Sequence, residues 1–423
     1  MSRSIVLMGT GGSSGRTLEA LEQRLSVMLG DVRFQFVDTQ PFNLRTEGHT
    51  AYHGKGRRFD TNMADVGMRR LSSSLSANLL LNGGPAMMRR LDAYAESILG
   101  KRHDAIVMVH DRVYIEQAFV RAAARLGTPS VIVQEGPFVH VGADTPQNPV
   151  LRIKHALAPL LTRTGLLPAI SSYGFAGHDL AVVPSKSYRQ RYIVAGMEPD
   201  RIAIGGVPRY DQIAELAARP APSTGESGPL QLLYLFQPFG EHGKVNPQTA
   251  AKVQLAMIEG LNRAGQARDI HVTIRIHPRS TADSVAHLTS ALHVPHTLDR
   301  CQRPIEQAID ANELVLGHYS SGLLEAMILS RSVLCIPIPA AAFAEQSEAG
   351  KQGWMAQSGA ALAHDAAEVA AAVERYDRGA PDLVPPSALE DEVGEIDGRA
   401  TDRCARAIAD LIESRGPPCG QTP

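Results

Sequence analysis

Short apolar segments alternate with longer amphipathic segments along most of this chain. The alternation is typical of βαβ units, in which helices join parallel strands, and it predicts an α/β protein. We expect strands at Ser4–Met8, Val32–Thr39, Ala105–His110, Ser130–Gln134, Leu180–Pro184, Leu230–Phe236, Val272–Ile276, Glu313–Leu316 and Val333–Ile338. We expect helices at Thr17–Leu29, Pro85–Leu99, Tyr114–Leu126, Lys186–Ala195, Gln248–Arg263, Pro304–Asp310, Ser321–Ser330, Ala366–Tyr376 and Arg399–Arg415. Residues 40–61, irregular and rich in glycine and basic residues, are predicted to form a mobile loop over a site.

The length of 423 residues exceeds what one ordinary core holds, so two domains are expected. Residues 218–229 are rich in Pro, Gly, Ser and Ala, as in an interdomain linker. The expected order is an N-terminal domain at 1–217, the linker, and a C-terminal domain at 230–398. A last helix at 399–415 can cross back to the N-terminal domain, and a Pro/Gly tail at 416–423 is expected to be disordered.

The charge balance, the cysteines and the N-terminal segment argue against several classes of protein. The 42 basic residues nearly balance the 44 acidic ones, so no global positive field favours nucleic acid as a partner. The four cysteines are scattered without a CxxC pair, which favours a reducing cytoplasm and disfavours a zinc site. The N-terminus reaches glycine after a short apolar run, so we expect a first strand there and not a signal peptide.

One segment, Leu151–Leu167, suggests peripheral contact with the inner face of a membrane. It places Arg152, Lys154, His155 and Arg163 among leucines, a composition suited to an anionic membrane surface. The alternative is a helical hairpin that packs on its own domain and is broken by Pro159.

Two segments of the second half predict an anion site. Ile274–Arg279 ends a strand with His277 and Pro278, flanked by Arg275 and Arg279, and Gly317–Ala326 follows the next strand. Ligands bind outside the carboxyl ends of strands in open α/β sheets, so both segments are expected at one site. Ser320 and Ser321 open a helix that also carries Glu325, and the first turn of a helix can hold a phosphate. A glycine-flexible loop after the strand at Leu230–Phe236 adds His242 and Lys244.

The turn Gly9–Gly15 follows the first strand and opens the first helix. Its glycines allow close approach of a ligand, but Gly11 and Gly12 do not fit the dinucleotide fingerprint GxGxxG. We therefore predict no cofactor, and we assign Gly11, Gly12 and Ser13 to the acceptor side of a site.

Two carboxylates follow neighbouring strands of the first half. Glu135 ends a strongly apolar strand, where desolvation raises a carboxyl pKa and suits a general base; the alternative is a capping or salt-bridging role. Asp111 ends the adjacent strand and is a candidate for orienting a substrate hydroxyl, with a structural role as the alternative. His287, His293 and His296 lack metal-ligand spacing, and no metal site is assigned.

These motifs resemble those of a known group of enzymes. His277-Pro278, Ser320-Ser321 and Glu135-Gly136 resemble the HP, Ser-Ser/Thr and acidic-acidic-Gly motifs of bacterial sialyltransferases and polysialyltransferases. The segment 206–211, GVPRYD, is similar to a segment of capsule and teichoic-acid polymerases, which use CMP-sugars or CDP-glycerol. The resemblance implies the GT-B fold: two Rossmann-like, doubly wound domains that face a cleft, with the acceptor in the first and the nucleotide donor in the second.

The same resemblance implies roles for single residues. Glu135 would deprotonate the acceptor hydroxyl, His277 would stabilise the departing phosphate, and Ser320 with Ser321 would hold that phosphate. The chain departs from the pattern at Gln134, where the family has a second acidic residue. The expected function is metal-independent transfer of a sugar from a nucleotide-activated donor, CMP-linked by resemblance, to a surface glycan or its lipid-linked precursor.

Two alternatives stay open. The region from His110-Asp111 to Glu135-Gly136 also resembles the H-G-D-T and E-A-G region of non-hydrolysing UDP-N-acetylglucosamine 2-epimerases, although Gly and Thr of the first motif are missing. The departure at Gln134 also leaves room for a catalytically silent, nucleotide-binding GT-B subunit of a polysaccharide assembly.

Overall fold

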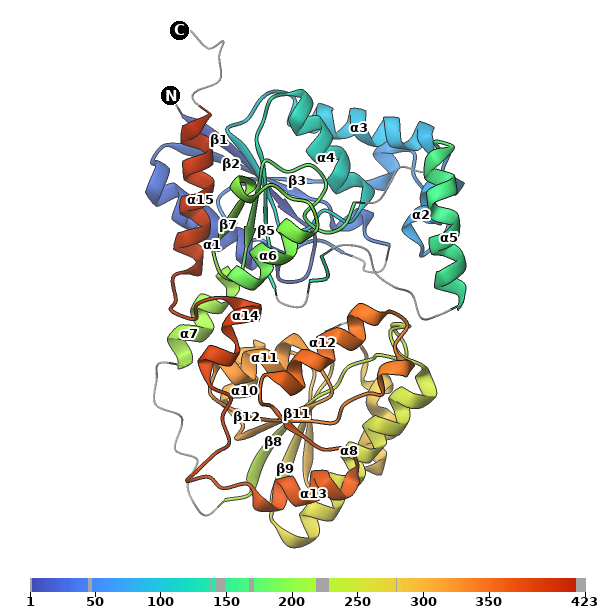
Figure 1. Ribbon diagram of the computed structural model, residues 1–423, viewed down its shortest axis with the longest axis vertical. Coiled ribbons are helices and arrows are strands. Elements are labelled where there is room, and N and C mark those ends of the chain that lie inside the picture. Colours follow the sequence, from blue (N-terminus) through green and yellow to red (C-terminus); the bar gives the residue numbers. More distant parts are fainter. Residues whose placement is uncertain are drawn as a thin grey trace. The chain divides into compact units, whose positions relative to one another are not determined.

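A computed structural model shows two compact units (Figure 1), each described here by itself. The first unit comprises residues 1–143, 153–211 and 391–423, and the second comprises 144–152 and 212–390. The structure describes residues 2–44, 48–136, 139–141, 149–166, 171–217, 228–278 and 280–415. Most of the expected linker, the expected tail at 416–423 and Arg279 lie outside this part of the chain.

The first unit is built on a seven-stranded parallel sheet with the order β3-β2-β1-β4-β5-β6-β7. Its strands are β1 (Arg3–Gly9), β2 (Val32–Asp38), β3 (Arg57–Asp60), β4 (Ala105–Met108), β5 (Ser130–Val133), β6 (Leu180–Val183) and β7 (Ile202–Ile204). The strand order reverses direction between β1 and β4, which makes their carboxyl ends the topological switch point of this sheet.

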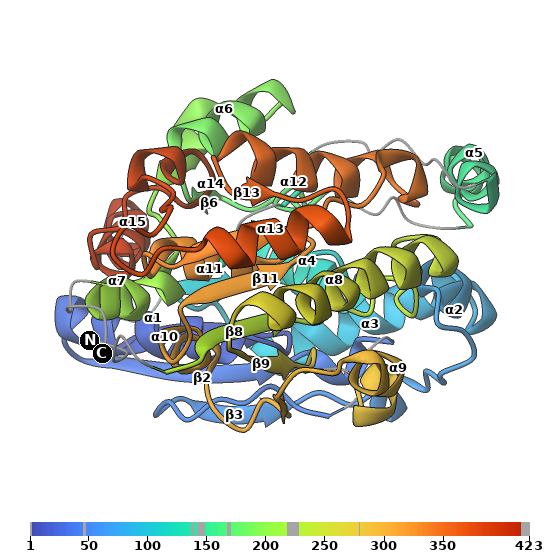
Figure 2. The same ribbon diagram turned by 90° about the horizontal axis from the view of Figure 1, so that it is seen from below.

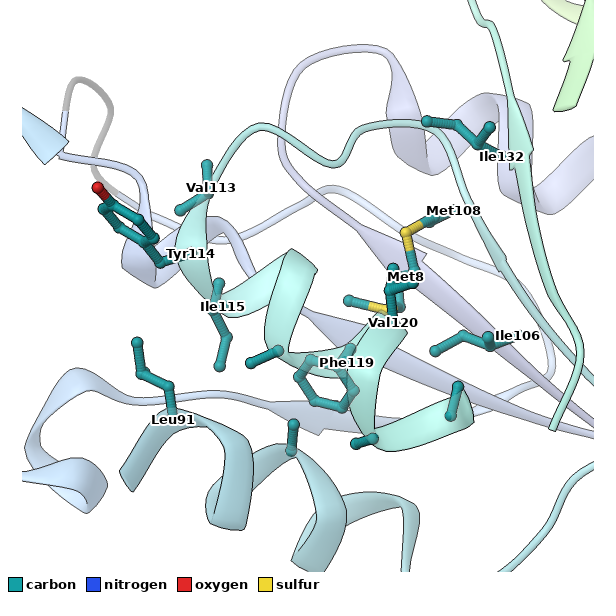
Figure 3. Close-up of a cluster of buried hydrophobic side chains, with 14 of the residues drawn as sticks. Met8, Leu91, Ile106, Met108, Val113, Tyr114, Ile115, Phe119, Val120 and Ile132 are labelled. Carbon is teal, nitrogen blue, oxygen red and sulfur yellow. The ribbon is translucent and has the colours of Figure 1, made fainter. Parts of the chain in front are cut away.

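Helices cover both faces of this sheet because its strands are apolar on both sides. The helices of this unit are α1 (Ser14–Leu29), α2 (Leu75–Leu81), α3 (Pro85–Leu99), α4 (Tyr114–Arg125), α6 (Lys186–Val194), α14 (Glu390–Val393) and α15 (Ala400–Ser414), with α5 (Pro149–Arg163) from residue 153 on. Helix α7 (Asp211–Ala217) begins at the end of this unit and belongs to the second unit from residue 212 on. Successive residues of β1 point to opposite faces, so Met8 packs with Phe119 of α4 and Leu91 of α3 in one core (Figure 3). Leu7 packs in the other core, which includes Leu18 of α1 and Ile408 of α15.

The second unit has a six-stranded parallel sheet with the order β10-β9-β8-β11-β12-β13. Its elements are β8 (Leu230–Leu235), α8 (Pro247–Ala267), β9 (Ile270–Arg275), α9 (Ala286–Ala291), β10 (His296–Asp299), α10 (Ile305–Asp310), β11 (Leu314–Gly317), α11 (Ser321–Ile328), β12 (Ser332–Cys335), α12 (Gln346–Gln357), β13 (Ala361–Leu362) and α13 (Ala366–Arg375). Helices α8 and α13 lie side by side (Figure 2) and pack on Tyr234 and Ile274 of the sheet. The switch point lies between β8 and β11.

In the first unit, α15 packs against α1 (Figure 1). An ion pair joins Arg24 of α1 to Asp402 of α15 at 2.6 Å. The carboxylate of Asp211, the last residue of the 206–211 motif, accepts hydrogen bonds from the first two backbone N–H groups of α15, those of Ala400 at 2.9 Å and Thr401 at 2.8 Å. Asp211 therefore has a structural role, because it caps the N-terminus of α15.

The two sheets and most helices confirm the α/β prediction, and two local predictions are wrong. Residues 57–60 form the edge strand β3 and do not belong to a mobile loop, because they pair with β2 along its whole carboxyl half. Residues 149–163 form one helix with Pro159 inside it, so there is no hairpin. Among the described helices, none is long and apolar enough to cross a membrane.

The cap at Asp211 leads to a stability prediction. Asp211→Ala should lower the free energy of unfolding by about 1–2 kcal/mol, because two N–H groups at the start of α15 lose their acceptor. Asp402→Ala, which removes only a partly exposed ion pair on the same helix, should cost less than about 1 kcal/mol. Urea unfolding followed by circular dichroism measures both, and equal losses would contradict the assigned role of Asp211.

Candidate functional site

The glycine turn after β1 stands at the switch point of the first sheet. Gly11 and Gly12 have φ of 89° and 61°, which residues with a Cβ adopt reluctantly. The Gly11 N–H donates to Thr50 Oγ1 at 2.8 Å, and Ser14 Oγ donates to the Gly11 carbonyl at 2.7 Å. The turn is therefore held rigidly from both sides.

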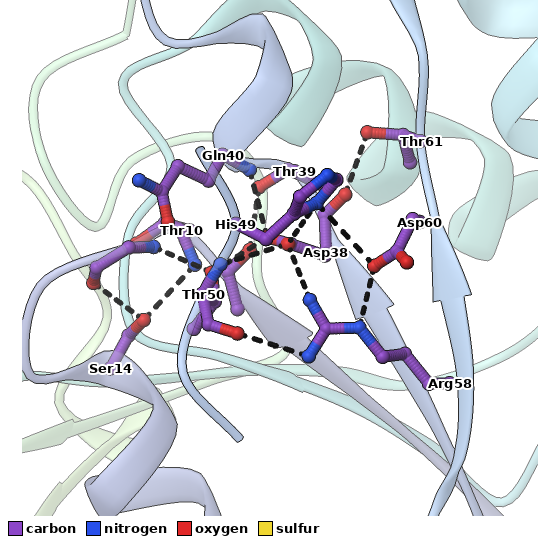
Figure 4. Close-up of polar contacts among 12 residues, drawn as sticks. Thr10, Ser14, Asp38, Thr39, Gln40, His49, Thr50, Arg58, Asp60 and Thr61 are labelled. Atoms are coloured by element: carbon purple, nitrogen blue, oxygen red, sulfur yellow. Dashed lines mark hydrogen bonds and ion pairs between the residues drawn. The ribbon is translucent and has the colours of Figure 1, made fainter. Parts of the chain in front are cut away.

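Asp38, at the end of β2, anchors the segment that holds this turn (Figure 4). It is fully buried, and it accepts hydrogen bonds from Thr50 Oγ1 at 2.6 Å and from Arg58 at 2.9 Å. Arg58 also pairs with Asp60 at 2.6 Å. Within the described residues, Asp38, His49 and Asp60 place ligand atoms within 4.8 Å of one another, as a metal site would. The Arg58 guanidinium already supplies the positive charge there, so we assign this cluster to loop anchoring.

The first-unit site is centred on Glu135, directly after β5. Ser13 is the N-cap residue of α1, yet its side chain does not cap the helix. Its hydroxyl donates instead to Glu135 Oε1 at 2.9 Å. The other carboxylate oxygen, Oε2, is buried and accepts no hydrogen bond from any residue that the structure describes. The structure thus brings Ser13 and Glu135 together, as predicted for one site.

Burial dominates the electrostatics of Glu135. It raises the pKa of the Glu135 carboxyl, while Arg209, the Ser13 hydroxyl, His110 and Arg16 partly oppose the shift. This direction confirms the prediction that an apolar strand end desolvates the carboxylate. A carboxylate with a raised pKa is a better proton acceptor near neutral pH, so the geometry and the shift both suit a general base.

His110 and Glu116 form a pair that the sequence did not predict. His110 follows β4, and its Nδ1 lies 2.7 Å from Oε2 of Glu116, which is buried in the first turn of α4. Burial opposes a charge on His110, but the Glu116 carboxylate outweighs burial and raises the pKa of the imidazole. The six-residue separation crosses a loop, and no helical or strand periodicity in the sequence signals this contact. His110 also acts on the charge of Glu135, so it belongs to the same site.

The structure gives Asp111 a structural role, which corrects its assignment to the acceptor side. The side chain is fully buried, and it accepts hydrogen bonds from the N–H groups of Gly174 at 3.0 Å and Ala176 at 3.2 Å. His178 Nε2 lies 3.2 Å from the same carboxylate. Its oxygens are used to hold residues 174–178, so Asp111 is poorly placed to orient a substrate.

Gln134 stands where the sialyltransferase motif that this segment resembles has a second acidic residue, and it is buried directly after β5. Its amide donates to the Gly136 carbonyl at 2.9 Å and so closes the turn that carries Glu135. A carboxylate at this position could not donate that bond. The departure from the family pattern therefore has a local structural explanation.

In the second unit, aromatic rings line the loops at the switch point between β8 and β11. Phe239 stacks on Tyr319 with ring centroids 5.0 Å apart, and Phe343 contacts Tyr319 at 5.6 Å. The loop after β8 is fixed to residues 342–344 by a short antiparallel bridge between Val245 and Phe343. All three rings are buried, so they pack these loops against one another.

His242 and His277 meet at this edge of the sheet. His277 follows β9 and His242 follows β8, and their rings lie edge to face with centroids 5.3 Å apart. Lys244 follows in the same loop as His242, and Pro278 is exposed beside His277. The sequence placed His242 and His277 at one site, and the structure brings them together. Arg279 lies outside the described residues.

Ser320 and Ser321 open α11 as predicted. Ser320 is the N-cap residue, and its hydroxyl accepts a hydrogen bond from the Leu323 N–H at 3.3 Å. Ser321 is exposed at the first helical position, and Glu325 is buried one turn further on. A Cβ on Gly322 would lie 2.9 Å from the side-chain end of Leu235 at the end of β8, so α11 starts close to that strand. The close approach brings the start of α11 to the switch point.

Arg275 does not fit the predicted donor site. Its side chain is buried on β9 and forms an ion pair with Asp299 of β10 at 2.5 Å. The same guanidinium donates to the Arg303 carbonyl at 2.8 Å. Because these partners already neutralise it, we leave Arg275 out of the proposed donor site.

Comparison with solved structures identifies the fold. A putative UDP-N-acetylglucosamine 2-epimerase from Listeria monocytogenes is similar over 98% of both chains, with a TM-score of 0.57 and 13% identity. The wall teichoic acid polymerase TagF is similar over 98% of this chain and 89% of its own, with a TM-score of 0.51 and 11% identity. The calicheamicin glycosyltransferase CalG4 matches 98% of this chain and 100% of its own, with a TM-score of 0.52 and 15% identity. No protein-family model and no curated protein sequence matches. The chain therefore has the GT-B fold, with two Rossmann-like units.

The raised pKa of Glu135 makes a prediction about stability and pH. The folded protein binds this proton up to a higher pH than the unfolded chain, whose glutamate pKa is about 4.3. The protonated Glu135 carboxyl therefore makes its full contribution to the free energy of unfolding below about pH 4.3. That contribution is lost as pH rises through the folded-state pKa of Glu135. Glu135→Gln removes that loss, so it should raise the melting temperature above that of wild type at neutral pH, and the gap should narrow toward about pH 4.

The control for this measurement is Glu198→Gln, which changes an exposed glutamate of the same unit. It should leave the melting temperature within error of wild type at every pH. A Glu135→Gln protein that melts below wild type at neutral pH would show that the charged carboxylate is stabilised and not strained by burial.

Proposed function

We propose that this protein is a GT-B glycosyltransferase that moves a sugar from a nucleotide-activated donor, CMP-linked, to a hydroxyl of a surface glycan or lipid-linked precursor. The observation that carries the proposal is the Glu135 carboxylate: its residue is partly buried, its Oε1 accepts a hydrogen bond from Ser13, its Oε2 is buried, and its pKa is raised. In the reaction, Glu135 takes the proton of the acceptor hydroxyl as that oxygen bonds to the sugar carbon. The bond from that carbon to the donor phosphate breaks, and the phosphate leaves with the electron pair.

The donor phosphate is assigned to the second unit. His277, with His242 and Lys244 in the loop after β8, supplies cationic or N–H donors at the carboxyl edge of the sheet. Ser320 and Ser321 begin α11, where hydroxyls and first-turn N–H groups favour an anion. Phe239 and Tyr319 are buried and stacked on each other, so they hold the loops that carry these groups. In this proposal side chains, and not a metal ion, neutralise the leaving phosphate.

A 2-epimerase that acts on a nucleotide-activated sugar is the second candidate, and one observation favours it. Inversion at a carbon that bears hydrogen removes a proton from one face and returns one to the other, which calls for two acid–base groups. His110, held by Glu116, stands near Glu135 and could be the second group. The inward position of Asp111 weighs against this candidate, because the resemblance to epimerases runs through His110-Asp111.

The decisive measurement is consumption of donor with and without an acceptor. A thermal-shift panel of CMP, CDP, UDP and GDP first identifies the nucleotide, since a ligand at a hundred times its Kd stabilises by about 2.7 kcal/mol. The matching nucleotide sugar is then incubated with and without glycan acceptors. A transferase should release nucleotide only with acceptor, and Glu135→Gln should abolish that release while nucleotide affinity stays unchanged.

The other functions give different results in the same assay. An epimerase interconverts the donor sugar without acceptor, and a silent subunit binds nucleotide and turns over nothing. Glu198→Gln serves as the matched control and should release nucleotide at the wild-type rate. Donor turnover that is the same with and without every acceptor, and the same in Glu135→Gln, would refute the transferase.

Substitutions of His277 and of the Ser320-Ser321 pair, both assigned to the donor phosphate, should affect different quantities: kcat for His277 and nucleotide affinity for the serines. His277→Ala should lower kcat at least about a hundredfold with little change in nucleotide Kd, because its role grows as charge develops on the departing phosphate. Ser320→Ala with Ser321→Ala should chiefly weaken nucleotide binding, because those groups contact the phosphate before reaction as well. Steady-state kinetics and calorimetric titration measure the two effects, and unchanged kcat in His277→Ala would remove His277 from the mechanism.

A further inference from the structure

Helix α5 carries an apolar stripe that the proposed function does not use. Ile153, Leu157 and Leu160 are spaced by four and three residues, which places them on one face of the helix. They are 63%, 49% and 57% exposed. Large apolar side chains that gather at this exposure on one element mark an interaction surface.

The helix is held on the first unit at its C-terminal end. Leu161 packs against the core formed by α3 and α4. The Leu166 carbonyl lies 3.0 Å from the position that a Cβ on Gly84 would occupy, at the turn between α2 and α3. Next to that turn, Leu81 is 62% exposed, and Leu166 itself is 48% exposed. The three residues of the stripe, Ile153, Leu157 and Leu160, define the surface that we call the leucine face.

The charge of the helix differs from that of the chain. Residues 149–166 contain no aspartate or glutamate, whereas the whole chain carries a net charge of -2. Arg152 and Arg163 are both exposed, and Lys154 and His155 lie between them in the sequence. Basic side chains that flank an apolar stripe are suited to the anionic headgroups and the acyl boundary of a bilayer.

We propose that α5 lies flat on an anionic membrane surface, with the leucine face inserted at the boundary between headgroups and acyl chains. The helix has 15 residues, which at 1.5 Å per residue is shorter than the roughly 30 Å of a hydrocarbon core, so it lies on the bilayer and does not span it. A second copy of the chain is a poorer occupant, because a two-fold contact through this face would bring the arginines of both copies together.

Vesicle flotation of the full-length protein tests this proposal. Wild type should float with vesicles of phosphatidylcholine that contain phosphatidylglycerol and should not float with phosphatidylcholine alone. Leu157→Asp with Leu160→Asp should reduce bound protein at least about tenfold, since the inserted apolar area is lost and negative charge is added. Arg152→Glu with Arg163→Glu should remove the preference for phosphatidylglycerol.

The control is Val27→Asp, which places one aspartate at another exposed apolar residue of the first unit, 73% exposed on α1. It should float like wild type. Equal flotation of the Leu157/Leu160 variant and wild type, or absence of wild type from anionic vesicles, would overturn the proposal. So would a wild-type dimer in light scattering that the Leu157/Leu160 variant loses, because a second copy would then cover the leucine face. Thermal unfolding of each variant shows that it is folded, and none of these readouts depends on the enzymatic reaction.

Discussion

Parallel strand pairing is the constraint on which the rest of this structure depends. Every strand of each sheet runs in the same direction, so the residues that follow the strands collect along one edge. In the first unit this edge gathers Ser13, His110 and Glu135, which are far apart in the sequence. In the second unit the same rule brings His242 to His277. The parallel direction of the strands alone therefore places the residues of both candidate sites at one edge of each sheet.

Burial then decides what each polar residue at the edge can do. Glu135 and Asp111 both follow apolar strands, but Asp111 is saturated by backbone N–H groups, whereas Glu135 has one hydrogen bond from Ser13 and a buried second oxygen. The Asp111 oxygens are occupied by the N–H groups of residues 174 and 176. Burial raises the pKa of the Glu135 carboxyl, which makes Glu135 a better proton acceptor. The contrast explains why only Glu135 is proposed for proton transfer.

The proposed transfer and the alternative epimerisation use the same fold, and the likeness to solved structures does not choose between them, because it shows the fold alone. The choice rests on the chemistry of the first-unit site. The pair formed by His110 and Glu116 is compatible with either reaction, since a charged imidazole can bind an anionic group or carry a proton. Gln134 donates a bond that shapes the turn, so its departure from the family triplet is compatible with an active enzyme.

The sequence by itself determined the fold class, most strand and helix positions, the cap at Ser320 and the placement of Glu135 at a desolvated strand end. These features depend on local patterns of apolar residues and on helix-start chemistry, which a single segment carries. Only the tertiary structure decided that Arg275 pairs with Asp299, that Asp111 turns inward and that Glu116 holds His110. The edge strand β3 was missed for a related reason, since all four of its residues are exposed and no apolar run marks it. A polar side chain bonds to whichever group of another segment lies next to it in the folded protein. Tertiary packing brings those segments together over long sequence distances, so the spacing within one segment does not predict the partner.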